Sequence, residues 1–585
     1  MKNAAESAHS PGSPYATSRL SFSPRLILYL VTAVVLLYGV VYPNLYVVAT
    51  SFQQSGRWSI ANYREVLTQR IVIEAIFNSI GLSVTTVLLC ALVGIPLAFL
   101  FERYSFPGRQ LFAMLAALPL VLPPLVGTVA FVFLCGESGI LARSVQNFFH
   151  LQAPPWSLRG WPALLLFHTY TMYPFFYVLT GAGLRRIDAG MAEAARSLGA
   201  RRMRVLLRVV LPQLTPSLIA AALLTFMTSM ASFSAPLLFG GSIRVLTLEI
   251  FTARQRGDAV IAVTETVILA VISLAALLLF QRYEGTRKFV AAAMKGAPRR
   301  RQDISSGKAR AFATVTAILF SIILVLPVAT LVVVSFAREE SWTTQTLPPS
   351  YTVSNYVRVF TDQQASEVFV NSFLMSAIAA MAALVWSFCV VTVITKRSPR
   401  TVNNKLRFIG QGWNRLLSLL VLVPWALPGT VVAVSAAEAY GRPSPLMGSF
   451  ILVGTFWILP FVYFLRFMPL VVRAVQASME QIDPTLDEAA RSTGAGAWQR
   501  LVRVTLPLVW PGAIAGSLLA FVIALGEYVA SVLVFVPANR PISIAIASEL
   551  RDFHLGTAAA YGVALVGIIA ISMTVAAKLE RLRSG

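Results

Sequence analysis

Long apolar runs, separated by short polar stretches, fill this chain from near its start to its end. Each run reaches about 20 residues or more, the length that a helix needs to cross a bilayer core of about 30 Å. We predict a transmembrane helix in each of twelve runs, over about 26–49, 73–100, 111–135, 162–183, 209–234 and 258–280 in the first half, and about 311–336, 367–394, 416–437, 447–469, 508–534 and 557–577 in the second.

Composition supports this interpretation. Hydrophobic residues make up 57% of the chain, charged residues only 12%, and the mean hydropathy is +0.71. These values exclude a chain of soluble domains and predict an all-α polytopic membrane protein. Residues 1–24 are predicted to form a polar cytoplasmic tail. The apolar run after Arg25 is too long for a signal-peptide core and is expected to remain as an uncleaved first span.

One polar stretch occurs twice, once in each half. Glu193-Ala194-Ala195, Gly199 and Leu211-Pro212 recur in register as Glu488-Ala489-Ala490, Gly494 and Leu506-Pro507, and Asp188 and Asp483 precede the two copies at the same spacing. An N-cap acid followed by a proline starts a helix, and a glycine in a left-handed conformation ends one. Each copy is therefore predicted to fold as a helix, a tight turn and a second helix.

The repeat extends beyond these loops. Ser59, Asn62 and Tyr63 match Thr352, Asn355 and Tyr356, and Asn78-Ser79 matches Asn371-Ser372. Thr169 and Pro174 are paired with Thr455 and Pro460. Ser59 and Thr352 are expected to cap short helices outside the membrane. The repeat predicts two halves of six spans in the same orientation, over residues 25–283 and 311–585, joined by a basic linker over 284–310.

The net charge of +23 is explained by topology. Most of the 48 Lys and Arg residues fall in the N-terminal tail and in alternate loops between spans, the pattern of cytoplasmic loops in membrane proteins. This distribution places both repeated loops and both termini in the cytoplasm. Anionic lipid headgroups are the expected partner of the linker around Arg299-Arg300-Arg301. No nucleic-acid partner is predicted.

The repeated loop resembles the cytoplasmic signature loop of permeases in binding-protein-dependent ATP-binding-cassette (ABC) importers, in the form that fuses two permease halves. The resemblance implies two tandem six-helix halves of the type I importer fold in a bacterial inner membrane. It also implies two copies of a separate ATPase subunit and a solute-binding protein that is periplasmic or lipid-anchored. The residues implied in ATPase coupling are Asp188, Glu193, Ala194, Ala195, Gly199, Asp483, Glu488, Ala489, Ala490 and Gly494.

The chain carries no sign of its own catalysis. It has no Gly-x-x-x-x-Gly-Lys-Ser/Thr phosphate loop, so ATP hydrolysis must belong to another polypeptide. The four histidines are scattered, and the three cysteines show no metal-ligand spacing. We therefore expect a transport subunit with no enzymatic activity, no cofactor and no metal site.

Ionisable residues inside the predicted spans are few, which argues against an ion-coupled carrier. They are His168, Glu265 and Glu527. Ser232, Phe233 and Ser234 correspond to the region of Glu527 and Tyr528, and both segments resemble the fifth helix that lines the path in this family. Glu527 is either a path residue or a buried acid that holds a helix break. The neighbouring Gly526 and Tyr528 favour the second interpretation.

Two other protein classes fit the sequence less well, and the substrate has several candidates. A major-facilitator-type carrier also has six plus six spans, but its Gly-Asp-Arg-rich loop is missing from 101–110. A membrane enzyme is disfavoured because no polar cluster occurs at a consistent depth. The resemblance is nearest to ferric-iron permeases, with thiamine and phosphonate permeases as alternatives. The sequence shows no iron ligand set, and none is required where an external binding protein selects the substrate.

Overall fold

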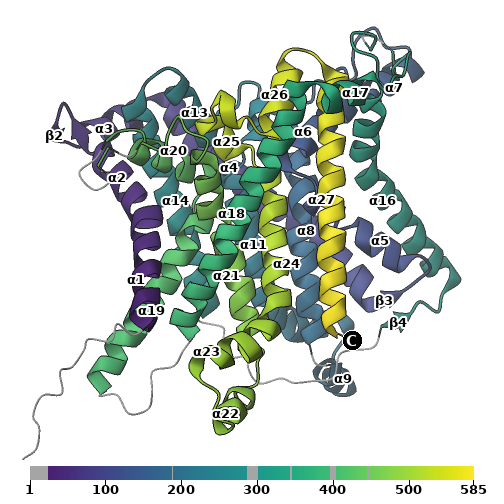
Figure 1. The fold of residues 1–585 in the computed structure, drawn as a ribbon. Coiled ribbons are helices and arrows are strands. Elements are labelled where there is room, and N and C mark those ends of the chain that lie inside the picture. The colour runs from purple at the N-terminus through teal and green to yellow at the C-terminus, as the bar shows by residue number, and fades with distance from the viewer. Residues whose placement is uncertain are drawn as a thin grey trace, which may run out of the picture.

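The structure is a computed structural model that describes residues 24–187, 189–285, 301–342, 345–395, 404–443, 448–449 and 451–584. Asp188, almost all of the predicted tail and residues 286–300 of the linker lie outside the described residues. The described chain is almost entirely helical, with two pairs of two-residue strands (Figure 1).

The first half contains fourteen α-helices among its described residues. They are α1 (Pro24–Leu36), α2 (Tyr42–Ser51), α3 (Ala61–Thr68), α4 (Arg70–Arg103), α5 (Arg109–Leu115), α6 (Pro124–Cys135), α7 (Ile140–Phe148), α8 (Gly160–Arg186), α9 (Ala189–Ser197), α10 (Arg202–Val205), α11 (Leu211–Met230), α12 (Ser234–Phe239), α13 (Leu246–Gln255) and α14 (Ala259–Gly285). Shorter elements are η1 (Leu37–Val41), β1 (Gln53–Gln54), β2 (Arg57–Trp58), β3 (Tyr104–Ser105), η2 (Leu118–Leu120) and η3 (Leu206–Val210).

The second half repeats the same order of long and short helices. They are α16 (Gly307–Ser335), α17 (Ser354–Thr361), α18 (Gln363–Thr395), α19 (Asn404–Ala426), α20 (Gly429–Tyr440), α21 (Ile458–Glu480), α22 (Pro484–Ser492), α23 (Ala497–Arg500), α24 (Leu506–Leu525), α25 (Val529–Val534), α26 (Ile542–Arg551) and α27 (Leu555–Ser584). β4 (Gln302–Asp303) precedes them, and η4 (Leu501–Thr505) and η5 (Pro537–Asn539) lie within them.

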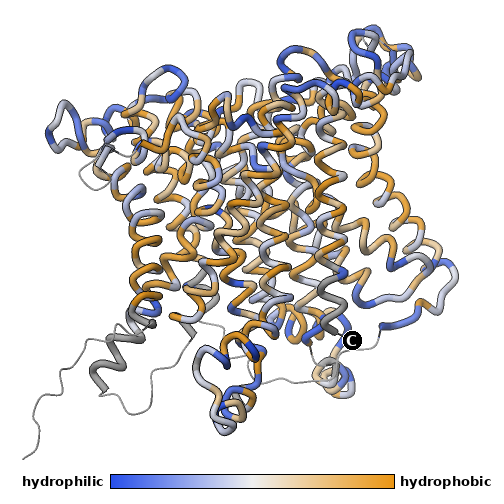
Figure 2. The backbone as a smooth tube through the Cα atoms, in the orientation of Figure 1, coloured by the Kyte–Doolittle hydropathy of each residue, from blue (hydrophilic) through white to orange (hydrophobic). Residues whose placement is uncertain are grey.

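Apolar residues form a belt through the middle of the molecule, and polar residues gather at its two ends (Figure 2). Ten helical segments of the described chain are long and apolar enough to cross a membrane, or eleven if the bent pair α19 and α20 counts as one span. The prediction of a polytopic all-α membrane protein is therefore confirmed. α8 runs for 27 residues where the fourth span was predicted, but it is not among the eleven.

Several predicted spans are interrupted by breaks. The run 111–135 is divided between α5, η2 and α6, and the run 416–437 bends by 105° between α19 and α20. The runs 209–234 and 508–534 pass beyond the ends of α11 and α24 into separate short helices. Proline or glycine at three of these breaks removes helix hydrogen bonds or permits other backbone angles, which a hydropathy average does not detect; the break after α11, over 231–233, contains neither.

The helix predicted over 447–469 has the wrong bounds. Its helix, α21, begins at Ile458 and continues to Glu480. The apolar residues before it fold instead against α20, where the backbone N–H groups of Leu452 and Val453 donate to the carbonyl oxygen of Tyr440. Because these loop residues are as apolar as those of a span, the hydropathy pattern predicted a helix that begins too early in the sequence.

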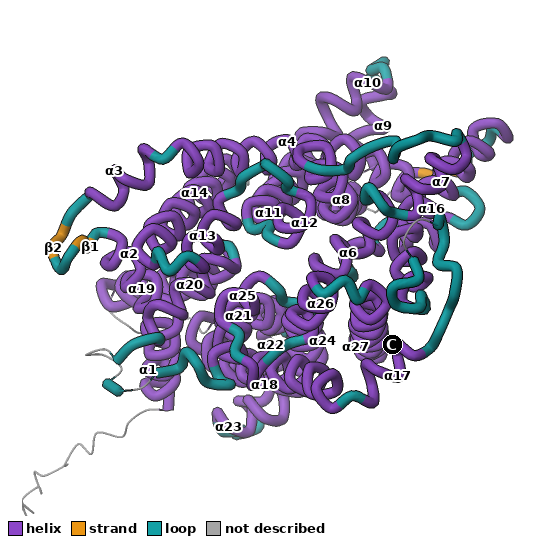
Figure 3. The backbone as a smooth tube through the Cα atoms, turned by 90° about the horizontal axis from the view of Figure 1, so that it is seen from above, coloured by secondary structure: helices purple, strands orange, loops and turns teal. Residues whose placement is uncertain are grey.

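The two halves exchange their first helices. α1 packs on α18 and α2 packs on α20, both in the second half, whereas α16 packs on α5 and α6 of the first half. Seen from above, the remaining long helices form two groups that face each other, with α4, α8, α11 and α14 in one and α18, α21, α24 and α27 in the other (Figure 3). The exchange ties the halves into one body.

Matching hydrogen bonds confirm much of the internal repeat. The Asn62 side chain donates to the carbonyl oxygens of Ser51 and Gln53, and Asn355 donates to those of Ser335 and Ala337 in the same way. The hydroxyls of Ser79 and Ser372 each accept an N–H from the start of the following outer helix, α13 or α26. Ser59 and Thr352 likewise accept the first N–H groups of α3 and α17, as expected for caps.

One predicted correspondence is wrong. Thr169 lies well inside α8, whereas Thr455 precedes α21, so these residues occupy different places in the two halves. The helix bounds instead pair Pro174 with Pro469, since each lies inside its helix at a similar distance from the end that leads to the repeated loop.

Candidate coupling loops and translocation path

The two repeated loops have the predicted backbone. α9 and α22 each end before a glycine with positive φ, 83° at Gly199 and 80° at Gly494. In each copy the N–H of the residue after this glycine bonds to the carbonyl five residues back, from Ala200 to Ala195 and from Ala495 to Ala490. This Schellman motif satisfies the last carbonyl groups of the helix and fixes the direction of the chain that follows.

The two loops lie at the same end of the molecule, where α9 and α22 project below the apolar belt (Figure 1). Glu193, Ala194, Glu488 and Ala489 are exposed, while Ala195 and Ala490 are partly buried. Large apolar side chains beside them are open to solvent, including Leu198 at 88% and Trp498 at 73% exposure. Each loop thus presents small, acidic and apolar groups on one protruding surface, which suits a protein partner more than lipid.

The start of α22 follows the sequence prediction closely. The Asp483 carboxylate accepts the N–H of Thr485 at 2.9 Å, and this bond lowers the pKa of Asp483 below its ordinary value. Pro484 occupies the first helical position, where its missing N–H leaves no bond unmade. Asp188, which was expected to play the same part in the first loop, lies outside the described residues.

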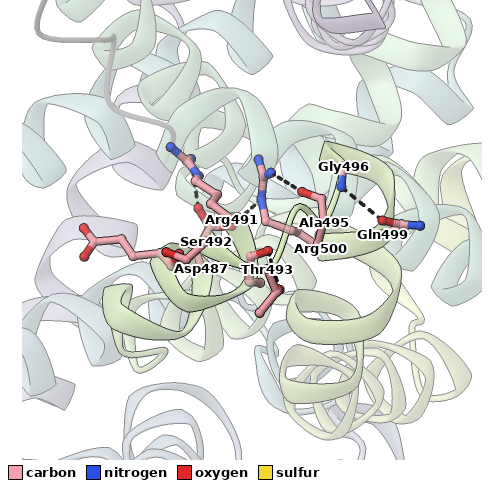
Figure 4. Close-up of polar contacts among 10 residues, drawn as sticks. Asp487, Arg491, Ser492, Thr493, Ala495, Gly496, Gln499 and Arg500 are labelled. Carbon is pink, nitrogen blue, oxygen red and sulfur yellow. Dashed lines mark hydrogen bonds and ion pairs between the residues drawn. The ribbon is translucent and has the colours of Figure 1, made fainter.

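The second loop is also held by ion pairs that the sequence analysis missed. Asp487 accepts from Arg491 at 2.9 Å and from Arg500 at 2.8 Å, and Arg500 also donates to the Ala495 carbonyl oxygen at 2.9 Å (Figure 4). Gln499 accepts the N–H of Gly496. These contacts join the two short helices on either side of the Gly494 turn into one unit.

Each loop continues directly into a long rod. α10, the π-helical segment η3 and α11 form one span over Arg202–Met230, and α23, η4 and α24 form one over Trp498–Leu525. The π segments occupy matching positions, Leu206–Val210 and Leu501–Thr505. A displacement at either loop can therefore reach the interior of the membrane domain along a continuous helix.

The far ends of these rods meet at the contact between the halves. The rods end at Met230 and Leu525, and α12 and α25 begin just beyond. Phe233 and Tyr528, which the sequence analysis proposed as path residues, lie in these breaks with ring centroids 5.9 Å apart. Both side chains are buried, and Ser234 beside Phe233 is buried as well. In this conformation the paired breaks close against each other.

Glu527 holds the second break together. Its Oε1 accepts from the Arg466 guanidinium at 2.6 Å and from the Ala530 N–H at 2.9 Å. Its backbone carbonyl accepts the hydroxyls of Ser531 and Ser543. With its side chain 6% exposed, Glu527 matches the interpretation of a buried acid that holds a helix break.

The first half holds its corresponding break with neutral groups. Ser232, at the position of Glu527, shares a 2.9 Å hydrogen bond with Nε2 of His168. Nδ1 of His168 lies 3.3 Å from the Thr86 hydroxyl and 3.2 Å from the Ser229 hydroxyl. His168 is fully buried, and its contacts join α8 to α4 and α11. In the described part of the chain no group of three His, Cys, Asp or Glu side chains is placed to hold a metal.

On the opposite side from the loops, an ion pair connects the halves. Arg254 at the end of α13 donates to Glu438 of α20 at 2.8 Å, and both side chains are largely buried. The corresponding corner, where α26 approaches α6, is apolar and includes Phe133 and Leu550. The two outer corners of the interface therefore differ in chemistry.

Comparison with known proteins agrees with this architecture. Residues 91–287 and 403–584 each match the family described as the binding-protein-dependent transport system inner membrane component. A probable ABC transporter permease protein (y4fN) from Sinorhizobium fredii is 33% identical over 523 residues, which cover 89% of this chain and 90% of that protein.

More distant relatives include permeases with named substrates. The ferric transport system permease FbpB of Actinobacillus pleuropneumoniae is 23% identical over 95% of this chain and 78% of its own length. A probable molybdenum ABC transporter permease of Haloferax volcanii is 30% identical over 36% of this chain and 76% of its own length.

The chain belongs to the family of binding-protein-dependent transport system inner membrane components, and it carries two copies of the family domain. It is therefore a multi-pass inner-membrane permease of an ABC importer and is not itself an enzyme. Membership of this family implies an ATPase and a solute-binding protein as partners.

Proposed function

We propose that this chain forms the complete translocation path of an ABC importer and couples it to two copies of an ATPase through α9 and α22 with the turns that follow them. The proposal rests on the two loops, which lie on the same face and end their first helices with the same glycine cap. Each loop continues into a long helical rod, and the two rods end beside the contact between Phe233 and Tyr528. Closure of an ATPase pair would draw the loops together and separate the breaks.

The proposal includes the finer topology. If α8 is counted with the eleven candidate spans, each half has six, and the total is twelve. The basic residues then place the loops, the linker and both termini in the cytoplasm. The domain limits remain those of the repeat, 25–283 and 311–585. The opposite face, with α3, α17, α13 and α26, would receive the solute-binding protein, whether periplasmic or lipid-anchored.

Substitution of the cap glycines tests the coupling role. A Cβ added at Gly199 or Gly494 meets no atom within 4 Å, so a change to Val strains the backbone without a clash. We expect a cost of roughly 1–2 kcal/mol for the left-handed turn. Stimulated ATP hydrolysis and uptake should fall together in proteoliposomes, and membrane insertion should persist. The exposed Gly56 also has positive φ and open space around it; because it lies on the face opposite the loops, Gly56→Val is the matched control for backbone strain, read as unchanged ATPase binding and unchanged ATP hydrolysis without binding protein.

Normal transport in both glycine variants, with normal ATPase binding, would refute the coupling role. The stoichiometry has a separate test. Native mass measurement of the purified complex should give one permease chain for two ATPase chains, because one chain already carries both loops. A complex with two permease chains would contradict the proposal.

The proposed substrate is ferric iron, supported by two relatives that match most of this chain and are named as a ferric and a putative ferric transport system permease. Proteoliposomes with the ATPase and binding protein should take up Fe(III) loaded on that binding protein. Thiamine and a simple alkylphosphonate are the competing substrates. Uptake of either one, with none of Fe(III), would overturn the iron assignment and leave the coupling role untouched.

A further inference from the structure

The two coupling loops are held in place by different contacts. In the second loop, Asp487 joins Arg491 and Arg500 across the turn. In the first loop, the repeat places Ala192 and Val205 at the positions of Asp487 and Arg500, so this ion-pair cluster cannot form. Val205 is instead buried in a small apolar cluster with Val210 and Leu214.

A second carboxylate lies at the base of the first loop. Glu102, near the end of α4, accepts through Oε1 from Arg185, which belongs to the last turn of α8 directly before the loop. Through Oε2 it accepts from Arg301 at 3.3 Å. The Glu102 side chain is only 14% exposed, and the Gly181 backbone packs beside it.

Arg301 belongs to the linker between the halves. The two residues after it form β4, which pairs in parallel with β3, the segment that follows α4. Tyr104 is aligned with Gln302 and Ser105 with Asp303. β3 and β4 lie at the same end of the molecule as α9 and α22 (Figure 1). The end of the linker is thus fixed to the first half by backbone pairing and by one shared carboxylate.

The second half lacks the residues for an equivalent arrangement. The register set by Asn78 and Asn371 places Thr395 opposite Glu102, and the register of the repeated loops places Glu480 opposite Arg185. A threonine and a glutamate cannot reproduce a carboxylate between two guanidinium groups. The Glu102 cluster is therefore specific to the first loop.

We propose that Glu102 is a positioning residue through which the linker and α4 hold the first coupling loop in the orientation that receives its ATPase. This inference rests on the coupling role proposed above. It makes the linker part of the coupling machinery of the first half, whereas the second loop is organised by its own Asp487 cluster.

The test uses the full chain reconstituted with its ATPase and binding protein. Glu102→Gln keeps the size of the side chain and removes the charge that Arg185 and Arg301 share, and Arg301→Gln removes the linker contact alone. Each should lower the apparent ATPase affinity and the stimulated ATP hydrolysis by roughly two- to fivefold, the range for partly exposed ion pairs. Arg301→Lys should restore most of the activity.

Combinations of variants separate positioning from general stability. Glu102→Gln with Arg301→Gln should be no worse than Glu102→Gln alone, because both act through one carboxylate. Asp487→Asn should add its effect to that of Glu102→Gln, because it acts on the other loop. Arg310→Gln is the matched control, since Arg310 is an exposed cation nearby that lies outside the cluster.

Wild-type affinity and hydrolysis in both Glu102→Gln and Arg301→Gln would overturn the inference. If Glu102→Gln does not insert, Arg301→Gln decides, because its side chain is 43% exposed and its loss threatens folding little. A Gly199→Val variant tells the two proposals apart. If it loses coupling while the Glu102 and Arg301 variants do not, only the positioning role fails; if all three couple normally, the coupling role of the first loop fails too.

Discussion

Replacement of Glu527 by alanine should be among the most destabilising single changes in the interior of this permease. The change removes the acceptor for both the Arg466 guanidinium and the Ala530 N–H. The Arg466 side chain is 19% exposed. A Cβ added to Gly429 would come within 1.9 Å of its Nη1, so the backbone at Gly429 packs closely against the guanidinium. A guanidinium left in this position without its carboxylate has little access to water.

The expected cost follows from this burial. Removal of one member of a buried ion pair typically destabilises a protein by about 3–5 kcal/mol, because the remaining charge stays uncompensated. Ser232→Ala at the corresponding position of the first half loses one hydrogen bond between neutral groups, worth about 0.5–1.5 kcal/mol. Glu527→Ala should therefore be the more damaging by a few kcal/mol. Replacement of both Glu527 and Arg466 by apolar residues should recover much of the loss.

Thermal unfolding of the purified variants in detergent measures these differences. The midpoints should fall in the order wild type, Ser232→Ala, Glu527→Ala, with the double apolar variant above Glu527→Ala. If Glu527→Ala unfolds no earlier than Ser232→Ala, the ion pair is not what holds the second break. A stable Glu527→Ala protein that has lost uptake would instead assign Glu527 to the path.

Three further changes have defined outcomes. The lowered pKa of Asp483 means that its cap stabilises α22 at pH values above the ordinary 3.8 and is lost as pH falls through the lowered value; the protection of the Thr485 amide, measured as its exchange rate relative to the intrinsic rate at each pH, should persist to below that ordinary value and be absent at all pH values in Asp483→Ala. Loss of the Arg254–Glu438 pair by Arg254→Gln should raise ATP hydrolysis without binding protein by about two- to fivefold, and a charge swap should reverse this; unchanged hydrolysis would mean that the pair does not hold the outer side closed. Glu265 is 2% exposed, and its Oε2 has no hydrogen-bond partner among the described residues; Glu265→Leu should raise the thermal midpoint and preserve uptake, and lost uptake would reveal a transport role.

The parts of the fold that the sequence predicted well are those set by local chemistry. The turn at Gly494 follows from a residue that tolerates positive φ, and the start of α22 follows from Asp483 and Pro484. Asn62 and Asn355 were recognisable as repeats because the same local turn requires the same amide in both halves. Signals of this kind lie within a few residues and survive in a single sequence.

Breaks inside the spans were harder to predict, because a hydropathy window averages over them. The bend between α19 and α20 occurs at Leu427-Pro428-Gly429, and this Pro-Gly step was the signal available in the sequence. The end of α24 at Gly526 carried a similar signal. Both breaks are stabilised by residues distant in the chain, so their geometry depends on packing that no local pattern contains.

The displaced fourth span of the second half had a direct consequence for the site. With a helix over 447–469, Arg466 falls at a span end, where a cation is ordinary, and it was not counted among the buried ionisable groups. With the helix over Ile458–Glu480, Arg466 lies in its interior and faces Glu527. A shift in one boundary therefore hid the partner that explains how an acid is accommodated at the second break.

The different chemistry of the two halves also bears on how the breaks can move. In the first half, His168 forms hydrogen bonds with the Ser232 and Ser229 hydroxyls. Such bonds between uncharged groups can be replaced by bonds to other hydroxyls at small cost in free energy. On the second side, Glu527 and Arg466 must stay together, because separation would leave two charges unpaired in the membrane interior. The second break should therefore move as a rigid unit with α21, and the first should supply most of the local adjustment when Phe233 and Tyr528 separate. The loops at the other ends of the rods follow the same division, since the second loop is fixed by its own ion pairs and the first is anchored from outside through Glu102.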